Sequence, residues 1–133
     1  MNKIYISYAN EDFQKALLVQ KILDENNLST TTVDHTSLNT NGDIAETMLN
    51  EIKNHEIFLF LFSKYANESN FFSIELNAAI KRNKKVYILA LDASSIDERL
   101  NFTINNSSFI EYSTLKTSVN KFIKLINRGN NNE

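Results

Sequence analysis

The chain has 133 residues and a formal net charge of -2 at pH 7, a length that suits one domain. It contains no cysteine, which excludes disulfide frameworks, thiolate zinc sites and cysteine nucleophiles. The acidic balance argues against electrostatic binding of nucleic acid. No apolar run approaches the roughly 18 residues of a membrane span, and the first residues show no signal-peptide pattern. We therefore expect a cytoplasmic protein without nucleic-acid or membrane partners.

Two residue types are rare. Proline is absent, and glycine occurs only at Gly42 and Gly129. Phosphate-binding loops and dinucleotide fingerprints need several glycines at fixed spacing, so both are excluded. Asparagine is abundant, and we interpret it as a source of turns and helix caps rather than as a binding site.

The first part of the chain predicts a strand, a helix and a second strand. Residues 3–8 form the first strand pattern. A helix pattern runs from Glu11 to Asn26, with Asn10 as its N-cap and apolar residues at helical spacing. Residues 29–33 are rich in β-branched side chains and predict a short strand that suits a sheet edge.

The rest of the chain continues the alternation. A polar loop over 35–42 is followed by a helix whose start at Asp43 and Glu46 resembles a capping box. The remaining predicted elements are a strand at 57–62, a polar loop at 63–69, a helix at 70–82, a strand at 86–91, a short helix and loop at 92–103, a strand at 109–112 and a helix from Leu115 that Gly129 closes.

Five strand patterns that alternate with helix patterns predict an α/β fold. We expect a doubly wound, five-stranded parallel sheet of flavodoxin-like type. Ligands of such folds bind outside the carboxyl ends of the strands. This rule directs attention to the segments after Tyr8, Asp34, Ser63 and Asp92.

One residue contradicts the polarity pattern of its helix. On a helical wheel, Glu75 falls inside the apolar arc of residues 70–83, one turn after Phe71. A carboxylate on a core-facing stripe is costly unless it is paired or lines a cavity. One interpretation is that Glu75 extends to water near the helix start. The other is a functional carboxylate near the carboxyl edge of the sheet, with its pKa raised by burial.

Four segments of the sequence resemble the Toll/interleukin-1 receptor (TIR) domain. Residues 4–8, Ile-Tyr-Ile-Ser-Tyr before an acidic helix start, are similar to the opening motif of the family. Residues 33–44 resemble its second strand and BB loop, 60–65 its third strand, and 69–76 the motif that contains the glutamate. The four matches fall in the family's order, so we expect a TIR fold in one domain.

The resemblance covers nearly the whole chain. We expect the TIR domain to span residues 1–129, with 130–133 as a disordered tail or linker stub. The chain departs from the family pattern at Phe71, which replaces a tryptophan, at Phe72, which replaces a cysteine, and at Asn41, which replaces a proline before the BB-loop glycine. Phe71 retains an apolar side chain, so these departures do not exclude activity.

The resemblance implies an NAD⁺-cleaving enzyme. Many TIR domains break the nicotinamide–ribose bond of NAD⁺ with the glutamate that aligns with Glu75, and the products are ADP-ribose or cyclic ADP-ribose isomers. Bacterial members often act in antiphage defence or signalling. One carboxylate suffices in principle, because cationic nicotinamide leaves as a neutral molecule and needs no general acid. We expect NAD⁺ as substrate and no cofactor.

Glu75 is therefore the candidate catalytic residue. The candidate substrate-binding residues are Ser7, Tyr8, Asn10, Asp34 and Phe71, together with Thr40, Gly42 and Ile44, which similarity to the family adds from the BB loop. No metal is expected, because the two histidines are isolated from further ligands. The same resemblance implies, and we expect, that the active form is a homo-oligomer joined through the BB loop and that a downstream effector senses the product.

Two other functions remain open. The first is a non-catalytic TIR module that acts by self-association. The second is a relative of the nucleoside deoxyribosyltransferases, which also place a glutamate at a ribose C1′. A response-regulator receiver is rejected, because Ser63 stands where its phosphoacceptor aspartate would end the third strand.

Overall fold

The computed structural model describes residues 3–34, 50–67, 70–94 and 108–131. Five parallel strands form one sheet in the order β2-β1-β3-β4-β5. This is the strand order of flavodoxin-like folds, and it confirms the fold class expected from the sequence. The elements are β1 (Lys3–Tyr8), the 3₁₀ turn η1 (Asn10–Asp12), α1 (Phe13–Glu25), β2 (Ser29–Asp34), β3 (Ile57–Phe62), α3 (Lys64–Asn67), α4 (Asn70–Lys81), β4 (Lys85–Ala90), β5 (Ser108–Ile110) and α6 (Leu115–Asn131).

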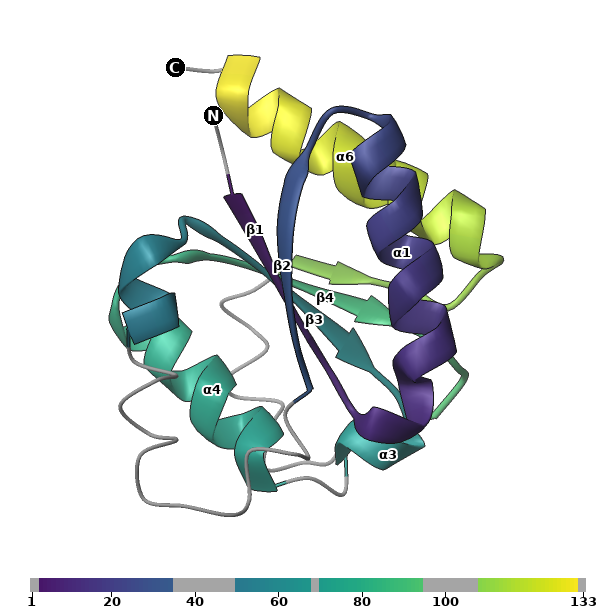
Figure 1. Ribbon diagram of the computed structural model, residues 1–133, viewed down its shortest axis with the longest axis horizontal. Coiled ribbons are helices and arrows are strands. Elements are labelled where there is room, and N and C mark those ends of the chain that lie inside the picture. Colours follow the sequence, from purple (N-terminus) through teal and green to yellow (C-terminus); the bar gives the residue numbers. More distant parts are fainter. Residues whose placement is uncertain (1–2, 35–49, 68–69, 95–107, 132–133) are drawn as a thin grey trace.

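Helices cover both faces of the sheet. Helices α1 and α6 lie on one face, and α4 lies on the other with the helical residues 50–54 (Figure 1). Strand β3 is buried along its whole length, as its continuous apolar sequence predicted. Strand β2 lies at an edge, also as expected, and β5 lies at the opposite edge. No helix in the described ranges is long and apolar enough to cross a membrane.

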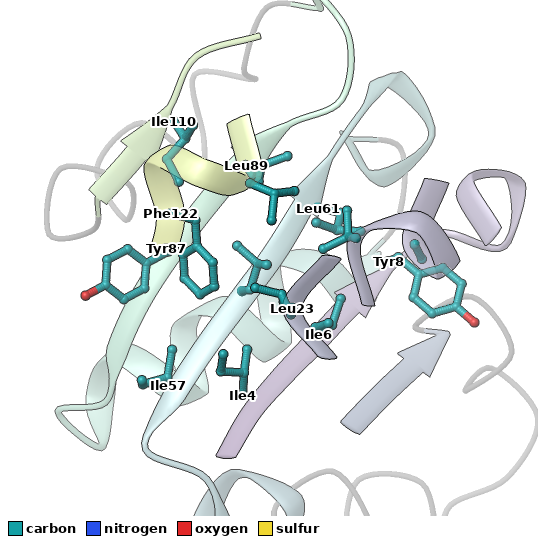
Figure 2. Packing of buried hydrophobic residues seen from close by; sticks show 14 of the residues in the cluster. Ile4, Ile6, Tyr8, Leu23, Ile57, Leu61, Tyr87, Leu89, Ile110 and Phe122 are labelled. Atoms are coloured by element: carbon teal, nitrogen blue, oxygen red, sulfur yellow. The ribbon is translucent and has the colours of Figure 1, made fainter. Parts of the chain in front are cut away.

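Successive side chains of β1 point to opposite faces of the sheet, so the core consists of two clusters, one on each face. Ile4, Ile6 and Tyr8 face α1 and α6, where they pack with the apolar residues shown in Figure 2. Tyr5 and Ala9 belong to the cluster on the opposite face, which includes Leu76 and Ala79 of α4. Successive residues of one strand therefore supply two separate environments, and only the second adjoins α4.

The ends of the helices differ from expectation in three places. The first helix does not begin at Glu11 with Asn10 as its cap, because a 3₁₀ turn comes first and its N-cap is Ala9. Residues 64–67, expected as loop, form the short helix α3. Gly129 does not close the last helix: α6 continues to Asn131, and no described glycine has a positive φ.

Asparagine ends two other helices instead. Asn27 and Asn83 have φ values of 63° and 57°, in the left-handed region. The amide that follows each of them bonds to a carbonyl five residues back: Leu28 N donates to Leu23 O at 3.0 Å, and Lys84 N donates to Ala79 O at 3.1 Å. These are Schellman motifs. The structure thus confirms that asparagine supplies helix caps in this glycine-poor chain.

Candidate active site

Glu75 lies in α4 and is buried against β1. Its side chain is only 1% exposed, so it does not extend to water. The hydroxyl of Tyr5 donates a hydrogen bond to Oε2 at 2.8 Å, and the hydroxyl of Ser7 donates to Oε1 at 3.1 Å. Each carboxylate oxygen therefore accepts one bond from β1, and each retains a further acceptor position.

The strand order explains why these three side chains meet. Tyr5 and Ser7 are two residues apart, so they point to the same face of the sheet, the face that α4 covers. Strand β1 pairs with β2 on one side and with β3 on the other. The connection after β1 leads to the strand on one side of it, and the connection after β2 leads to the strand on its other side, so the strand order reverses at β1. In this fold class, ligands bind at such a switch point. Glu75 is therefore placed where the fold favours a site.

Burial dominates the electrostatics of the carboxylate. Loss of hydration raises the pKa of Glu75 to about 7, although the hydrogen bonds from Tyr5 and Ser7 act to lower it. The direction agrees with the sequence prediction. Burial raises the pKa of Tyr5 far above its usual range, and the neighbouring charge of Glu75 raises it further. Tyr5 therefore stays protonated and remains a hydrogen-bond donor at every working pH.

Tyr5 was not predicted as a site residue, because an aromatic residue within a strand usually belongs to the core. It is indeed buried, in contact with two rings: the ring centroid of His55 lies 5.6 Å away and that of Phe58 lies 5.0 Å away. One signal was available in the sequence. Tyr5 and Ser7 are two residues apart in the strand, so their side chains point to the same face of the sheet. A buried carboxylate such as Glu75 needs hydrogen-bond donors on that face.

His55 is held beside Tyr5 by its own hydrogen bonds. Its Nδ1 lies 2.7 Å from the carbonyl oxygen of Glu51, and its Nε2 lies 3.2 Å from Oγ1 of Thr31 in β2. The imidazole is 4% exposed, so the ring is locked between the sheet and residues 50–54. His55 is therefore a buried, bonded residue that supports the ring of Tyr5.

The structure does not bring every predicted site residue to Glu75. Tyr8 lies on the opposite face of the sheet, where its ring centroid is 6.3 Å from that of Phe13 (Figure 2). Asn10 is exposed in η1. Asp34 ends β2 and Phe71 lies one turn before Glu75 in α4, but their side chains are outside the described part. Thr40, Gly42 and Ile44 are also outside the described residues.

A second polar cluster stabilises the carboxyl edge of the sheet. The hydroxyl of Ser63 donates a short hydrogen bond to Asp12 and accepts the amides of Tyr65 and Ala66, each at 3.2 Å. Ser63 is thus the cap of α3. Burial raises the pKa of Asp12, and the bond from Ser63 opposes this. The pair has a structural role, because it joins the turn after β1 to the turn after β3.

The described residues also line two surface cavities. One, of about 360 Å³, lies between β5 and α6; the other, of about 280 Å³, lies between α1, the end of β4 and residues 112–115 at the start of α6. Neither is lined by Glu75. Within the described ranges, no group of three or more histidine, aspartate or glutamate side chains could hold a metal ion.

Solved structures with the same fold include TIR domains and a glycosidase. The TIR domains of the Roq1 resistosome are 16% identical, with a TM-score of 0.70, and the match covers 95% of this chain and 99% of that one. The RPS4–RRS1 TIR heterodimer matches with 10% identity, a TM-score of 0.69 and coverage of 96% and 97%. The CMP N-glycosidase BcmB of Clostridium botulinum matches with 16% identity, a TM-score of 0.65 and coverage of 89% and 97%.

The sequence itself gives the family. No curated protein sequence matched the chain. The family model of the TIR domain, however, matches residues 4–125, nearly the whole length. Together with the strand order and the structural matches, this establishes that the chain belongs to the TIR domain family.

Proposed function

We propose that this TIR domain is a glycohydrolase that breaks the N-glycosidic bond between nicotinamide and ribose in NAD⁺, with Glu75 as the catalytic carboxylate. The observation that carries the proposal is the buried Glu75 carboxylate, which two hydroxyl groups of β1 hold at the switch point of the sheet. A buried charge has a high cost in stability, and active sites are where such costs are commonly found.

The chemistry requires little more than a placed negative charge. As the bond between C1′ and the nicotinamide nitrogen breaks, its electron pair passes to the ring, and nicotinamide leaves as a neutral molecule. Positive charge develops on the ribose, and ionised Glu75 stabilises it in a medium of low dielectric. Water then adds at C1′ and releases a proton, which gives ADP-ribose; attack by the adenine of the same molecule gives a cyclic isomer instead.

The pKa of Glu75 makes a prediction about pH. Only the ionised form stabilises a cationic ribose, so NAD⁺ cleavage should increase through pH 7 and level off above it. Tyr5 cannot serve as an acid, because its raised pKa keeps its proton in place. The proposed site therefore suits a leaving group that needs no protonation.

A nucleotide N-glycosidase is the second candidate. Its support is the matching fold of a CMP N-glycosidase, together with a carboxyl group whose pKa of about 7 lets it carry a proton at neutral pH. A neutral pyrimidine leaves far more easily when it is protonated. If Glu75 supplied that proton, the rate would decrease as the pH rises through 7, the opposite of the trend for NAD⁺.

Assembly is part of the proposal. Glu75 is 1% exposed, so a substrate reaches it only after neighbouring segments have moved. Structural relatives are solved as a resistosome and as a heterodimer, which supports association of TIR domains. We therefore expect a homo-oligomer as the active form. A product that signals to a downstream effector, as in bacterial antiphage defence, would extend the same scheme.

The experiment is an incubation of the purified chain at high concentration with NAD⁺ and, separately, with CMP. Products are followed by liquid chromatography and mass spectrometry across pH 6 to 9, a range that brackets the pKa of Glu75 near 7. Glu75→Gln removes the charge but preserves the shape of the side chain. Glu111→Gln, at an exposed carboxylate, is the matched control.

Each outcome assigns a function. Nicotinamide release that Glu75→Gln abolishes and Glu111→Gln retains supports the NAD⁺ glycohydrolase. Cytosine release from CMP, with NAD⁺ left intact, supports the nucleotide glycosidase. If the oligomeric chain leaves both substrates intact, the proposal is wrong and the non-catalytic interaction module takes its place.

A further inference from the structure

The Glu75 carboxylate is held by two donors from one strand. Tyr5 bonds Oε2 and Ser7 bonds Oε1, so rotation of the carboxylate about its terminal bond would break both contacts. The two donors differ in rigidity. The oxygen of a serine changes its position by rotation about the single Cα–Cβ bond, whereas the oxygen of Tyr5 lies in the plane of a ring that is packed against His55 and Phe58. The orientation of the carboxylate therefore depends mainly on where the Tyr5 ring lies.

The position of that ring is fixed on two sides. His55 contacts it edge to face and Phe58 lies tilted against it, with centroid distances of 5.6 and 5.0 Å. His55 is itself bonded at both ring nitrogens, to Glu51 and to Thr31. A chain of contacts thus runs from β2 and residues 50–55 through the ring of Tyr5 to the buried Glu75 carboxylate.

We propose that Tyr5 is a positioning residue: its hydroxyl fixes the Glu75 carboxylate so that the free acceptor positions of both oxygens are presented to the ribose. The inference rests on the proposed function, because it assigns Tyr5 a part in the same site. Tyr5 acts through Glu75 and does not need to touch the substrate. Orientation within a few tenths of an ångström is what catalytic groups require of the residues that support them.

The charged groups near the pair define what the test must control. Among the described residues, the groups that bear on Glu75 are Tyr5 and Ser7 of β1. Glu51, from the segment that precedes β3, adds its charge at Tyr5. The imidazole of His55 lies against the Tyr5 ring. Tyr5→Phe removes the hydroxyl oxygen alone and leaves the rings, Ser7 and Glu51 in place.

The first test measures the contact without any substrate. The titration of Glu75 is followed by carbon-13 NMR of glutamate-labelled protein, with its signal assigned by its loss in Glu75→Gln. A hydrogen bond to a charged group contributes enough that Tyr5→Phe should raise the titration midpoint by roughly one pH unit. Tyr87→Phe is the matched control, because Tyr87 is a buried tyrosine in the cluster on the opposite face of the sheet.

The second test measures catalysis with NAD⁺. Tyr5→Phe should lower kcat for nicotinamide release at pH 7 roughly fivefold or more with little change in KM, because less Glu75 is ionised and its orientation is relaxed. The rise of kcat with pH on the acid side of the profile should shift to higher pH, by the same amount as the NMR midpoint. Tyr87→Phe should leave both unchanged. A loss of fold would lower activity at every pH and would leave the midpoint of this rise at the same pH.

The two tests fail in different ways. A Glu75 midpoint that Tyr5→Phe leaves unmoved overturns the positioning role, whatever the enzyme does with NAD⁺. If Tyr5→Phe moves the Glu75 midpoint but the wild-type protein releases no nicotinamide, the proposed function is contradicted and the contact itself is supported. If Tyr5→Phe fails to fold, replacement of the tyrosines by 3-fluorotyrosine, a stronger donor, should lower the midpoint, and an unchanged midpoint overturns the inference.

Discussion

At the scale of single residues, the burial of Glu75 is costly to the fold whenever its carboxylate is ionised. Its pKa is about 7 when folded, against an ordinary value of 4.5, because its carboxylate is removed from water. Between these two values the folded chain holds a proton that the unfolded chain has released. Stability from this group is therefore fully present below pH 4.5 and is lost as the pH rises through 7.

This linkage predicts how Glu75→Gln behaves. The neutral amide has the same shape and does not ionise, so it escapes the loss of stability. The free energy of unfolding of Glu75→Gln, relative to the wild type, should increase by roughly 2–3 kcal/mol between pH 5 and pH 8. Urea denaturation at the two values measures the difference. Parallel pH dependence of the two proteins would contradict the burial of an ionisable Glu75.

Glu75 also shows which part of the candidate site could be predicted from the sequence. Glu75 could be singled out because helical periodicity identifies a polar residue on an apolar stripe. Its partner Tyr5 could not be identified with the same ease. A tyrosine in a strand is usually a core residue, and the distance from Tyr5 to Glu75 is a tertiary property that no local pattern encodes. Helical periodicity identifies a polar residue on the apolar face of one helix, but it does not identify the residue of another element that contacts it.

At the scale of elements, the ends of helices are set by single residues. Asn27 and Asn83 occupy the left-handed positions after α1 and α4 that glycine usually fills. Asparagine is among the few residues other than glycine that adopt this region at modest cost. A chain with only two glycines can therefore still form Schellman caps.

Substitution of Asn83 tests this cap. Asn83→Ala should destabilise the protein by about 1 kcal/mol, because a Cβ without a compensating polar group is disfavoured at positive φ. Asn83→Gly should retain the stability or increase it. As a control, Asn120→Ala, at an exposed position inside α6, should be neutral or slightly stabilising. Urea denaturation checks all three. An Asn83→Ala protein as stable as the wild type would contradict the role of the cap.

Strands and long helices followed from the sequence, but short elements and ends did not. The continuous apolar run of β3 and the stripe of α6 are signals that extend over many residues. Helix α3 has four residues, fewer than periodicity needs, and the hydroxyl of Ser63 caps its start. Gly129 was expected to close α6, yet the apolar stripe that includes Phe122 and Ile126 is buried, and the helix runs past the glycine.

At the scale of the whole molecule, the burial of Glu75 sets a condition on the proposed activity. A carboxylate that is 1% exposed in the single chain must become accessible before it can act. The surface of α1 also carries exposed apolar side chains, Phe13, Leu17 and Leu18, each about half exposed. Exposed apolar groups that cluster on one helix are typical of surfaces that associate.

We therefore predict that activity depends on protein concentration. The rate of nicotinamide release per molecule of protein should increase as the protein concentration is raised over roughly two decades, and it should then level off, as mass action requires of an active oligomer. Rate measurements beside light scattering of the same samples provide the check. A constant rate per molecule, from samples that remain monomeric, would show that one chain suffices.

The most direct measurement of the central claim is the initial rate of nicotinamide release from NAD⁺ at pH 8 by the concentrated wild-type chain and by Glu75→Gln. We predict release by the wild type and a loss of roughly a hundredfold or more in the variant, because the charge that stabilises the ribose cation is gone. Urea denaturation of both proteins checks that each is folded. Release that persists at the wild-type rate in Glu75→Gln would contradict the claim that this buried carboxylate performs the chemistry.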